Sequence, residues 1–237
     1  MKDPPQEIYQ LIDAWKSPQV KLPEVVRWKK YIDKDEGTRP QNTLQHSHSI
    51  VLLGSIVLEK LRPYVDIDGR FVLTALNVHD IGEGEVGMDT LYFDKNVSAD
   101  LQEYVGFRKL YEILGQPVFD YLNKAFLLQF ALKNPPEFPE DARKVMDVLS
   151  KENKLECLIF EALERFDYIL YAMEQYLEKG NRKIAVQTLR NQIPHLDRLS
   201  GEIPGFRETV WTNEISEWCK NFIEFNKDIP IEQKGEI

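Results

Sequence analysis

Hydrophobic residues recur along most of this chain at intervals of three and four positions, which is the spacing of one face of an α-helix. The first such stripe runs through Ile8, Leu11, Ile12 and Trp15. No stretch shows the sustained alternation of apolar and polar residues that is typical of a half-buried strand. We therefore predict an all-α fold. The expected helical segments are 23–32, 46–61, 70–80, 98–114, 117–132, 139–149, 152–178 and 182–198.

The helical pattern continues through the chain without a clear domain boundary. A proline-rich interruption from Pro135 to Pro139 has apolar helical segments on both sides, so we interpret it as a loop within one domain. The last stripe consists of Trp211, Ile215, Trp218, Phe222 and Phe225. Its helical spacing predicts that the tail docks on the core. We expect residues 1–237 to form a single domain.

Composition and charge narrow the classes of function. Hydrophobic residues make up 43% of the chain and charged residues 29%, which is usual for a soluble globular protein. The formal net charge is −9, which argues against a nucleic-acid polymer as the main partner. A small anionic substrate remains compatible with this charge if a metal ion and a few local cations offset a phosphate group.

The cysteines and the apolar runs indicate in which cellular compartment we expect the protein. Cys157 and Cys219 cannot form a disulfide framework, so we expect free thiols in a reducing environment. The first residues lack the basic stretch followed by an apolar one that makes a signal peptide. The apolar run Ile50–Leu58 is too short to cross a membrane. We expect a cytoplasmic protein without a membrane partner.

The dipeptide His79-Asp80 is the most informative chemical feature of the chain. It closes an apolar helical run and is followed by Ile81, Gly82 and Glu83. Adjacent residues of a helix point about 100° apart, so both side chains reach one ion only near a helix end. Gly82 suits such an end because glycine adopts the left-handed backbone that closes many helices. A divalent metal would offset the cost of burying a charge here.

Of the remaining histidines, His46 is the better candidate for a second imidazole ligand. It shares a helix face with Ile50, Leu53 and Val57, and that pattern predicts burial. His48 lies on the opposite face, which we expect to be wetter. The alternative is that His46 is only a helix-start residue bonded to a backbone carbonyl.

A second carboxylate is expected from the longest helix. Asp167 lies there among apolar residues, and aspartate is rarely buried without a partner. The alternative is a salt bridge to Arg165. The predicted ligand set is His46, His79, Asp80 and Asp167. Two imidazoles and two carboxylates suit one divalent metal ion, such as Mn, Co, Fe, Ni or Mg, and leave room for water and substrate.

This order of a histidine, then His-Asp, then a distant aspartate resembles the HD-domain metal-dependent phosphohydrolases. The resemblance is closest to the branch that includes the bacterial 5′-deoxynucleotidases, where an Arg-Trp pair precedes the first histidine, as Arg27-Trp28 does here. In that branch His-Asp is followed by Gly-Glu and a further glycine, as in Gly82, Glu83 and Gly87. The match covers roughly residues 23–181. It implies an HD-domain helical bundle with additional C-terminal helices over 182–237.

The resemblance implies a metal-dependent hydrolase that acts on a nucleoside 5′-monophosphate or a similar small phosphomonoester. Its partner would be a small phosphorylated nucleotide, and the homodimers common in the branch favour a homodimer here. Glu83 lies one turn beyond the ligand pair, where it would orient a water molecule or exchange its proton. Arg27 would bind the phosphate through its planar fork, and Trp28 would stack on or sort the nucleoside. The alternatives are a solvated Glu83, a surface Arg27 and a core Trp28.

Two departures from the branch leave other functions open. The branch has an aspartate directly after the glycine equivalent to Gly87, whereas this chain has Met88, with Asp89 one position later. Asp89 would then replace the usual catalytic acid through a shifted loop. Gln45 stands where the branch has glutamate. Alternative substrates are a nucleoside triphosphate, a guanosine alarmone or a cyclic nucleotide. A different class of function is also open, in which the protein is a catalytically weak, metal-stabilised module that binds a nucleotide or a protein.

Overall fold

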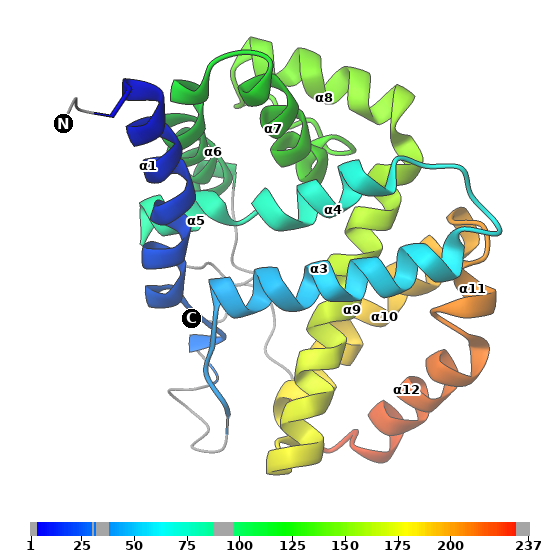
Figure 1. Ribbon diagram of the computed structural model, residues 1–237. Helices are drawn as coiled ribbons and strands as arrows, with labels where there is room; N and C mark the ends of the chain where they lie inside the picture. Colours follow the sequence, from blue (N-terminus) through cyan, green and yellow to red (C-terminus); the bar gives the residue numbers. More distant parts are fainter. Residues whose placement is uncertain (1–3, 30, 32–37, 88–96, 231–237) are drawn as a thin grey trace.

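Helices make up nearly all the regular structure of the protein, as the sequence predicted (Figure 1). The computed structural model describes residues 4–29, 31, 38–87 and 97–230. The α-helices are α1 (Gln6–Lys21), α3 (Thr43–Leu61), α4 (Gly69–Val78), α5 (Ile81–Val86), α6 (Val97–Tyr111), α7 (Val118–Leu127), α8 (Glu140–Glu152), α9 (Lys154–Lys179), α10 (Arg182–Glu202), α11 (Phe206–Thr209) and α12 (Asn213–Phe225). Short 3₁₀ turns are η1 (Leu22–Glu24), η2 (Glu112–Leu114) and η3 (Leu128–Phe130). The all-α prediction is confirmed.

Helices α3, α4 and α9 form the centre of the bundle. Helix α3 crosses α9 and packs beside α4, while α10 runs along α9 (Figure 1). The predicted buried face of α3 is confirmed at Ile50 and Val57, which have almost no exposed surface. Burial of such side chains contributes roughly 1.5–3 kcal/mol each relative to exposure. This packing sets the distance between the first turn of α3 and the middle of α9, where the chemically interesting residues lie.

The helix predicted over 23–32 is wrong. Pro23 lies in η1, and the next residues form a two-residue strand, β1 (Val26–Arg27), that pairs antiparallel with β2 (Gln41–Asn42). The β-branched Val25 and Val26 favour extended backbone more than helix. Because β2 leads directly into α3, the pairing brings Arg27 next to the start of that helix.

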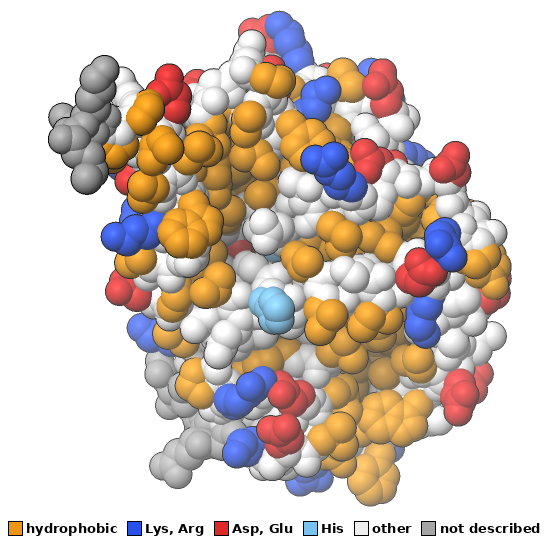
Figure 2. Space-filling model, in the orientation of Figure 1, with side chains coloured by type: hydrophobic (Ala, Val, Ile, Leu, Met, Phe, Trp, Pro, Cys, Tyr) orange, Lys and Arg blue, Asp and Glu red, His pale blue; other side chains and the backbone are white. Residues whose placement is uncertain are grey.

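Helix α1 forms as predicted but turns its apolar stripe outward. Leu11 and Trp15 are 59% and 68% exposed, and Ala14 is the residue of this helix that is buried. The helix packs beside α5 and α6, and Ser17 and Lys21 of α1 both donate to the Glu85 carboxylate of α5. Figure 2 shows hydrophobic side chains gathered over α1 at the upper left. Among the described residues, no helix is both long enough and apolar enough to cross a membrane.

The C-terminal helices dock on the core, as predicted from their aromatic stripe. Trp211 is fully buried, and Phe222 packs inward from α12, whereas Phe225 remains 85% exposed. Asp197 of α10 anchors this region because it accepts hydrogen bonds from Trp211 Nε1 at 2.8 Å and from Ser216 Oγ at 2.9 Å. The C-terminal helices α11 and α12 are therefore held on α10 by apolar packing and by the hydrogen bonds to Asp197.

Candidate metal centre

His46 lies in the first turn of α3, fully buried, while His48 faces solvent as predicted. The helix begins here because of a capping box. The Asn42 side chain accepts from Gln45 N at 2.9 Å, and the Gln45 side chain accepts from Asn42 N at 3.0 Å. Gln45, where the resembled branch has glutamate, therefore caps the helix that carries His46.

His79 and Asp80 occupy a break between α4 and α5. Helix α4 ends at Val78, and Asp80 leaves the helical conformation with φ −100° and ψ 4°. The predicted helix end is therefore confirmed, but the role predicted for Gly82 is wrong, because Gly82 lies inside α5. A Cβ at Gly82 would come within 2.1 Å of the carbonyl oxygen of Glu103. Glycine is needed there for the close approach of α6.

Both histidines have one ring nitrogen occupied by the protein. His79 Nδ1 lies 2.8 Å from the carbonyl oxygen of Leu76, and His46 Nδ1 lies 2.8 Å from Oδ2 of Asp167. These acceptors take a proton from Nδ1, and a neutral imidazole that donates there keeps its lone pair on Nε2. When the two rings are neutral, their Nε2 atoms therefore offer lone pairs to the space between α3, α5 and α9.

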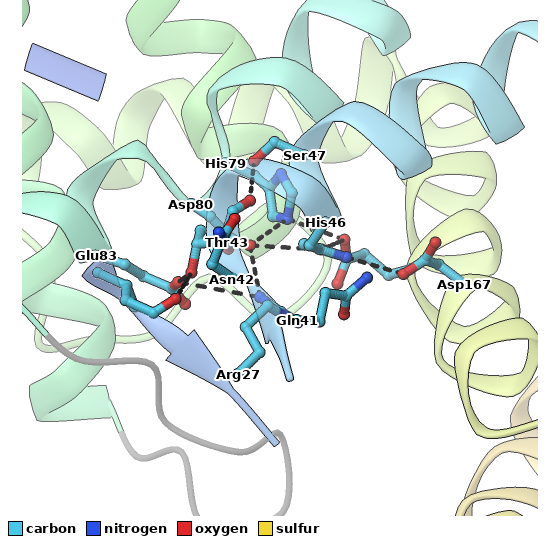
Figure 3. A network of polar contacts seen from close by, with 12 residues as sticks. Arg27, Gln41, Asn42, Thr43, His46, Ser47, His79, Asp80, Glu83 and Asp167 are labelled. Atoms are coloured by element: carbon cyan, nitrogen blue, oxygen red, sulfur yellow. Dashed lines mark hydrogen bonds and ion pairs between the residues drawn. The ribbon is translucent and has the colours of Figure 1, made fainter. Parts of the chain in front are cut away.

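Two carboxylates reach the same space, and Figure 3 shows one of them, Asp80, beside His79. Asp80 Oδ2 lies 3.0 Å from His79 Nε2 and 3.5 Å from His46 Nε2, and Glu164 Oε1 lies at the same two distances. The ligand atoms of His46, His79 and Glu164 all lie within 4.8 Å of one another. Three donor atoms thus lie close enough together to share one ion, and Asp80 Oδ2 lies beside two of them.

Glu164 is the residue that the sequence reasoning missed. Asp167 was expected in this position, but its oxygen contacts the opposite edge of the His46 ring (Figure 3). Glu164 precedes Asp167 by three residues and so lies on the same helix face, one turn earlier. That spacing of two acids on a mostly apolar face was the available signal, and it does not say which acid points into the site.

Three of the converging atoms lie close to one another but make no hydrogen bond to any described residue. His46 Nε2, His79 Nε2 and Glu164 Oε1 are buried, and none of them has a hydrogen bond to the part of the chain that the structure describes, although both Nε2 atoms lie 3.0–3.5 Å from carboxylate oxygens of Asp80 and Glu164. Buried polar atoms nearly always have hydrogen bonds, so three atoms without one around a single point favour a site built for a further group. Nitrogen and oxygen donors in this mixture fit a divalent ion such as Mn²⁺, Fe²⁺, Co²⁺ or Ni²⁺.

The charges of the site favour a cation as that group. Burial by itself raises the pKa of Asp80 and Glu164, but the adjacent His79 lowers both pKa values below the usual range, and Arg27 adds to this for Asp80. Burial likewise opposes protonation of His79, yet the two carboxylates raise its pKa well above 6.5. The buried carboxylates therefore need positive charge, which either a proton or a metal ion can supply.

Glu83 lies beside the cluster, one turn beyond Asp80. Its side chain is buried and forms part of a cavity wall. Oε2 of Glu83 accepts a hydrogen bond from Thr43 Oγ1 at 2.9 Å and lies 4.0 Å from Nη1 of Arg27. Thr43, the first residue of α3, thus holds the Glu83 carboxylate in place. The sequence alone did not predict this contact.

Arg27 and Trp28 have different surroundings, although they are adjacent. Arg27 is buried, lines the cavity and donates from Nη1 to Asp80 Oδ2 at 2.9 Å. Trp28 stacks on Tyr171 with ring centroids 4.7 Å apart and donates to the Gln41 side chain at 3.2 Å. Trp28 does not line the cavity beside the cluster. Its ring packs edge-on against Tyr168, and Tyr168 lines that cavity. Trp28 is therefore a core residue behind the cavity wall.

The cavity beside the cluster has a volume of about 250 Å³. One wall is polar, formed by Arg27, Asp80 and Glu83 with the two ligands His79 and Glu164. Apolar side chains in the lining include Leu128, Phe130 and Phe160, and the charged Lys133 and Arg165 also line the cavity. Ligand pockets typically run from about 300 to 1,000 Å³, so this one suits a small molecule.

Asp89 and Met88 lie outside the described residues, so the shifted-acid prediction stays a prediction. The chain leaves α5 at Gly87, which has a left-handed backbone with φ 81°. Glycine adopts this conformation at little cost, so Gly87, and not Gly82, is the left-handed residue that closes a helix here.

Comparisons with protein-family models, curated proteins and solved structures find no match to this chain. The resemblance to the HD-domain phosphohydrolases therefore rests on the motif residues alone. Any function of the site has to follow from the geometry of its side chains and the shape of its cavity.

Proposed function

We propose that this protein is a metal-dependent phosphohydrolase that cleaves a nucleoside 5′-monophosphate or a similar small phosphomonoester. The observation that carries the proposal is the convergence of buried donor atoms that make no hydrogen bond to the described residues, beside a cavity that is also lined by a carboxylate and a guanidinium group. His46, His79, Asp80 and Glu164 would hold one divalent cation. The first histidine and the His79-Asp80 pair, which are the part of the HD-domain motif that lies in this site, support the same chemistry.

The reaction adds water across a P–O ester bond and releases an alcohol and phosphate. A divalent ion in this site would lower the pKa of a water molecule from ~15.7 towards 7 and would offset phosphate charge. Glu83 is the group that orients the water and accepts its proton, because its carboxylate is fixed at the cavity wall by Thr43. The proton that Glu83 takes from the water is passed on, through solvent, to the departing oxygen as the P–O bond breaks, so that the products are an alcohol and phosphate.

Arg27 contributes a permanent positive charge at the phosphate end. Its guanidinium group is already anchored on Asp80, so little side-chain entropy is lost when an anion binds beside it. The apolar side chains that line the same cavity, Leu128, Phe130 and Phe160, suit the uncharged part of the substrate. A nucleoside monophosphate has such a division, with an anionic phosphate and a flat base.

A substrate panel with added metal tests the proposal. Purified protein is assayed against deoxyribo- and ribonucleoside 5′-monophosphates, a triphosphate and a cyclic nucleotide, with Mn²⁺, Co²⁺ or Mg²⁺ present. We expect phosphate release from the monophosphates that depends on the added ion and disappears with a chelator. Release from the triphosphate or the cyclic nucleotide alone would contradict the proposed substrate class.

Variants of two histidines on α3 separate metal loss from general damage to the helix. We expect about one divalent ion per chain in the wild type, no stable ion in His46→Ala or Asp80→Ala, and wild-type content in His48→Ala, because His48 faces solvent. Elemental analysis of dialysed protein measures this. Full metal retention in His46→Ala would overturn the proposed ligand set.

A further inference from the structure

Asp167 is the buried acid that the proposed reaction does not use. It lies on α9 one turn after Glu164, and only 6% of its surface is exposed. Its Oδ2 makes a 2.8 Å contact with Nδ1 of His46. In Figure 3 the carboxylate approaches the His46 ring from the side opposite to Asp80 and His79.

The two nitrogens of an imidazole point away from each other, so one ring cannot offer both to the same ion. His46 Nε2 faces Asp80 and Glu164 at 3.5 Å, which leaves Nδ1 facing Asp167. An ion bound at Nε2 therefore lies across the ring from the Asp167 carboxylate. The helix that carries both acids thus meets the ring at its two edges, with Glu164 on the ion side and Asp167 on the other.

We infer that Asp167 is a positioning residue that holds the proton of His46 on Nδ1 and so presents the Nε2 lone pair to the cation. The inference rests on the proposed metal site and gives Asp167 a role other than ligand. A metal-bound histidine commonly donates its second N–H to a carboxylate or a carbonyl, which fixes its tautomer and raises its basicity as a ligand. Loss of such a partner typically lowers metal affinity about 10- to 100-fold.

The second histidine of the site has the same arrangement with a weaker acceptor. His79 Nδ1 contacts the backbone carbonyl of Leu76 at 2.8 Å, an acceptor that no side-chain substitution can remove. His46 lies in the first turn of its helix, and its ring is oriented instead by a side chain 121 residues away. The orientation of His46 thus depends on how α9 packs on α3, and Asp167 is the contact that sets it.

Cobalt binding distinguishes a positioning residue from a ligand. Full-length protein freed of metal is titrated with Co²⁺, and the visible absorption reports both the affinity and the ligands around the ion. The variants are Asp167→Asn, Asp167→Ala and Glu164→Ala, with circular dichroism to check that each is folded. Asn keeps an oxygen that can accept from Nδ1, whereas Ala removes the acceptor.

We expect Asp167→Asn to bind one Co²⁺ per chain with the wild-type spectrum and close to wild-type affinity. Asp167→Ala should bind about 10- to 100-fold more weakly, with the same spectrum at saturation. Glu164→Ala should change the spectrum, because a ligand is lost. A purely structural role for Asp167 would lower the stability of the fold without this selective loss of cobalt affinity.

Two results would overturn the inference in different ways. If Asp167→Asn alters the spectrum and Glu164→Ala does not, Asp167 is the ligand and the assignment of the two acids is reversed. If the wild type binds no Co²⁺ at all, the proposed metal-dependent function fails together with the inference. Should Asp167→Ala not fold, the spectrum of the near-isosteric Asn variant still separates ligand from positioning residue.

Discussion

Thr43 offers a sharp test of the catalytic assignment of Glu83, because it touches that carboxylate without reaching the cavity. Its hydroxyl donates to Glu83 Oε2 at 2.9 Å, and the residue has no exposed surface. Thr43→Val keeps the shape of the side chain and removes this hydroxyl. If Glu83 handles the proton of the attacking water, the variant should lose turnover while it keeps both the metal and the substrate affinity.

The expected loss follows from the strength of the bond. A hydrogen bond to a charged group contributes about 1.5–3 kcal/mol, and each 1.36 kcal/mol corresponds to a tenfold change in rate. If the whole energy of this hydrogen bond stabilises the transition state, its loss lowers kcat by roughly 10- to 150-fold. Because Arg27 Nη1 still lies 4.0 Å from the same oxygen, part of the restraint on the carboxylate survives. We therefore expect a loss of about tenfold.

The assay is steady-state phosphate release from the preferred monophosphate, with metal content measured on the same preparations. Thr43→Ser should restore most of kcat, since it returns the hydroxyl. Ser47→Ala is the matched control, because Ser47 is buried one turn later on α3 and donates only to the backbone oxygen of Thr43 at 2.8 Å. A Thr43→Val enzyme with wild-type kcat and full metal content would refute the reasoning.

The remaining predictions concern the chemistry and the stability of the fold. Glu83→Gln should keep the metal and lose about 10²- to 10⁴-fold in kcat, the usual contribution of a general base; a loss below tenfold would assign Glu83 a structural role. Asp197 has a pKa lowered to about 2, because the hydrogen bonds from Lys220, Trp211 and Ser216 and the charge of Lys220 outweigh the opposing effect of burial. Since the folded pKa lies below the ordinary 3.8, and solvent screens this partly exposed carboxylate, Asp197→Asn should lower the free energy of unfolding by roughly 1 kcal/mol at pH 7. Urea titrations should show the difference shrinking as pH falls from about 4 through 2. A difference that does not change with pH would contradict this linkage. Trp28→Ala should cost about 3–5 kcal/mol in the same titrations because a buried, stacked ring is lost, and Trp28→Phe much less; near-wild-type stability of the alanine variant would place Trp28 outside the core.

Much of the fold follows from local patterns in the sequence. The stripe through His46, Ile50 and Val57 determined which face of α3 is buried, because helix geometry alone sets which residues share a face. The dipeptide His79-Asp80 lay at a helix end as predicted, since an apolar run stops there. These features depend on residues only a few positions apart, so a sequence reveals them without knowledge of the packing.

Other features depend on how distant segments meet. The strand at Val26–Arg27 exists because it pairs with Gln41–Asn42, and the local preference of two valines for extended backbone does not by itself predict that partner. The hydrogen bond from Thr43 to Glu83 joins residues 40 positions apart. The local sequence around either residue does not predict this contact. The apolar stripe of α1 was visible in the sequence, yet the small Ala14 is the part of that helix that packs inward.

The choice between Glu164 and Asp167 shows most directly what tertiary structure decides. Both acids lie on one face of α9, one turn apart, so the helical pattern treats them as equivalent. A turn of helix rises about 5.4 Å, which is more than the width of an imidazole ring. The axial position of α9 against α3 therefore determines which acid meets Nε2 of His46 and which meets Nδ1. That position is set by the packing of the whole core, and no local run of residues encodes it.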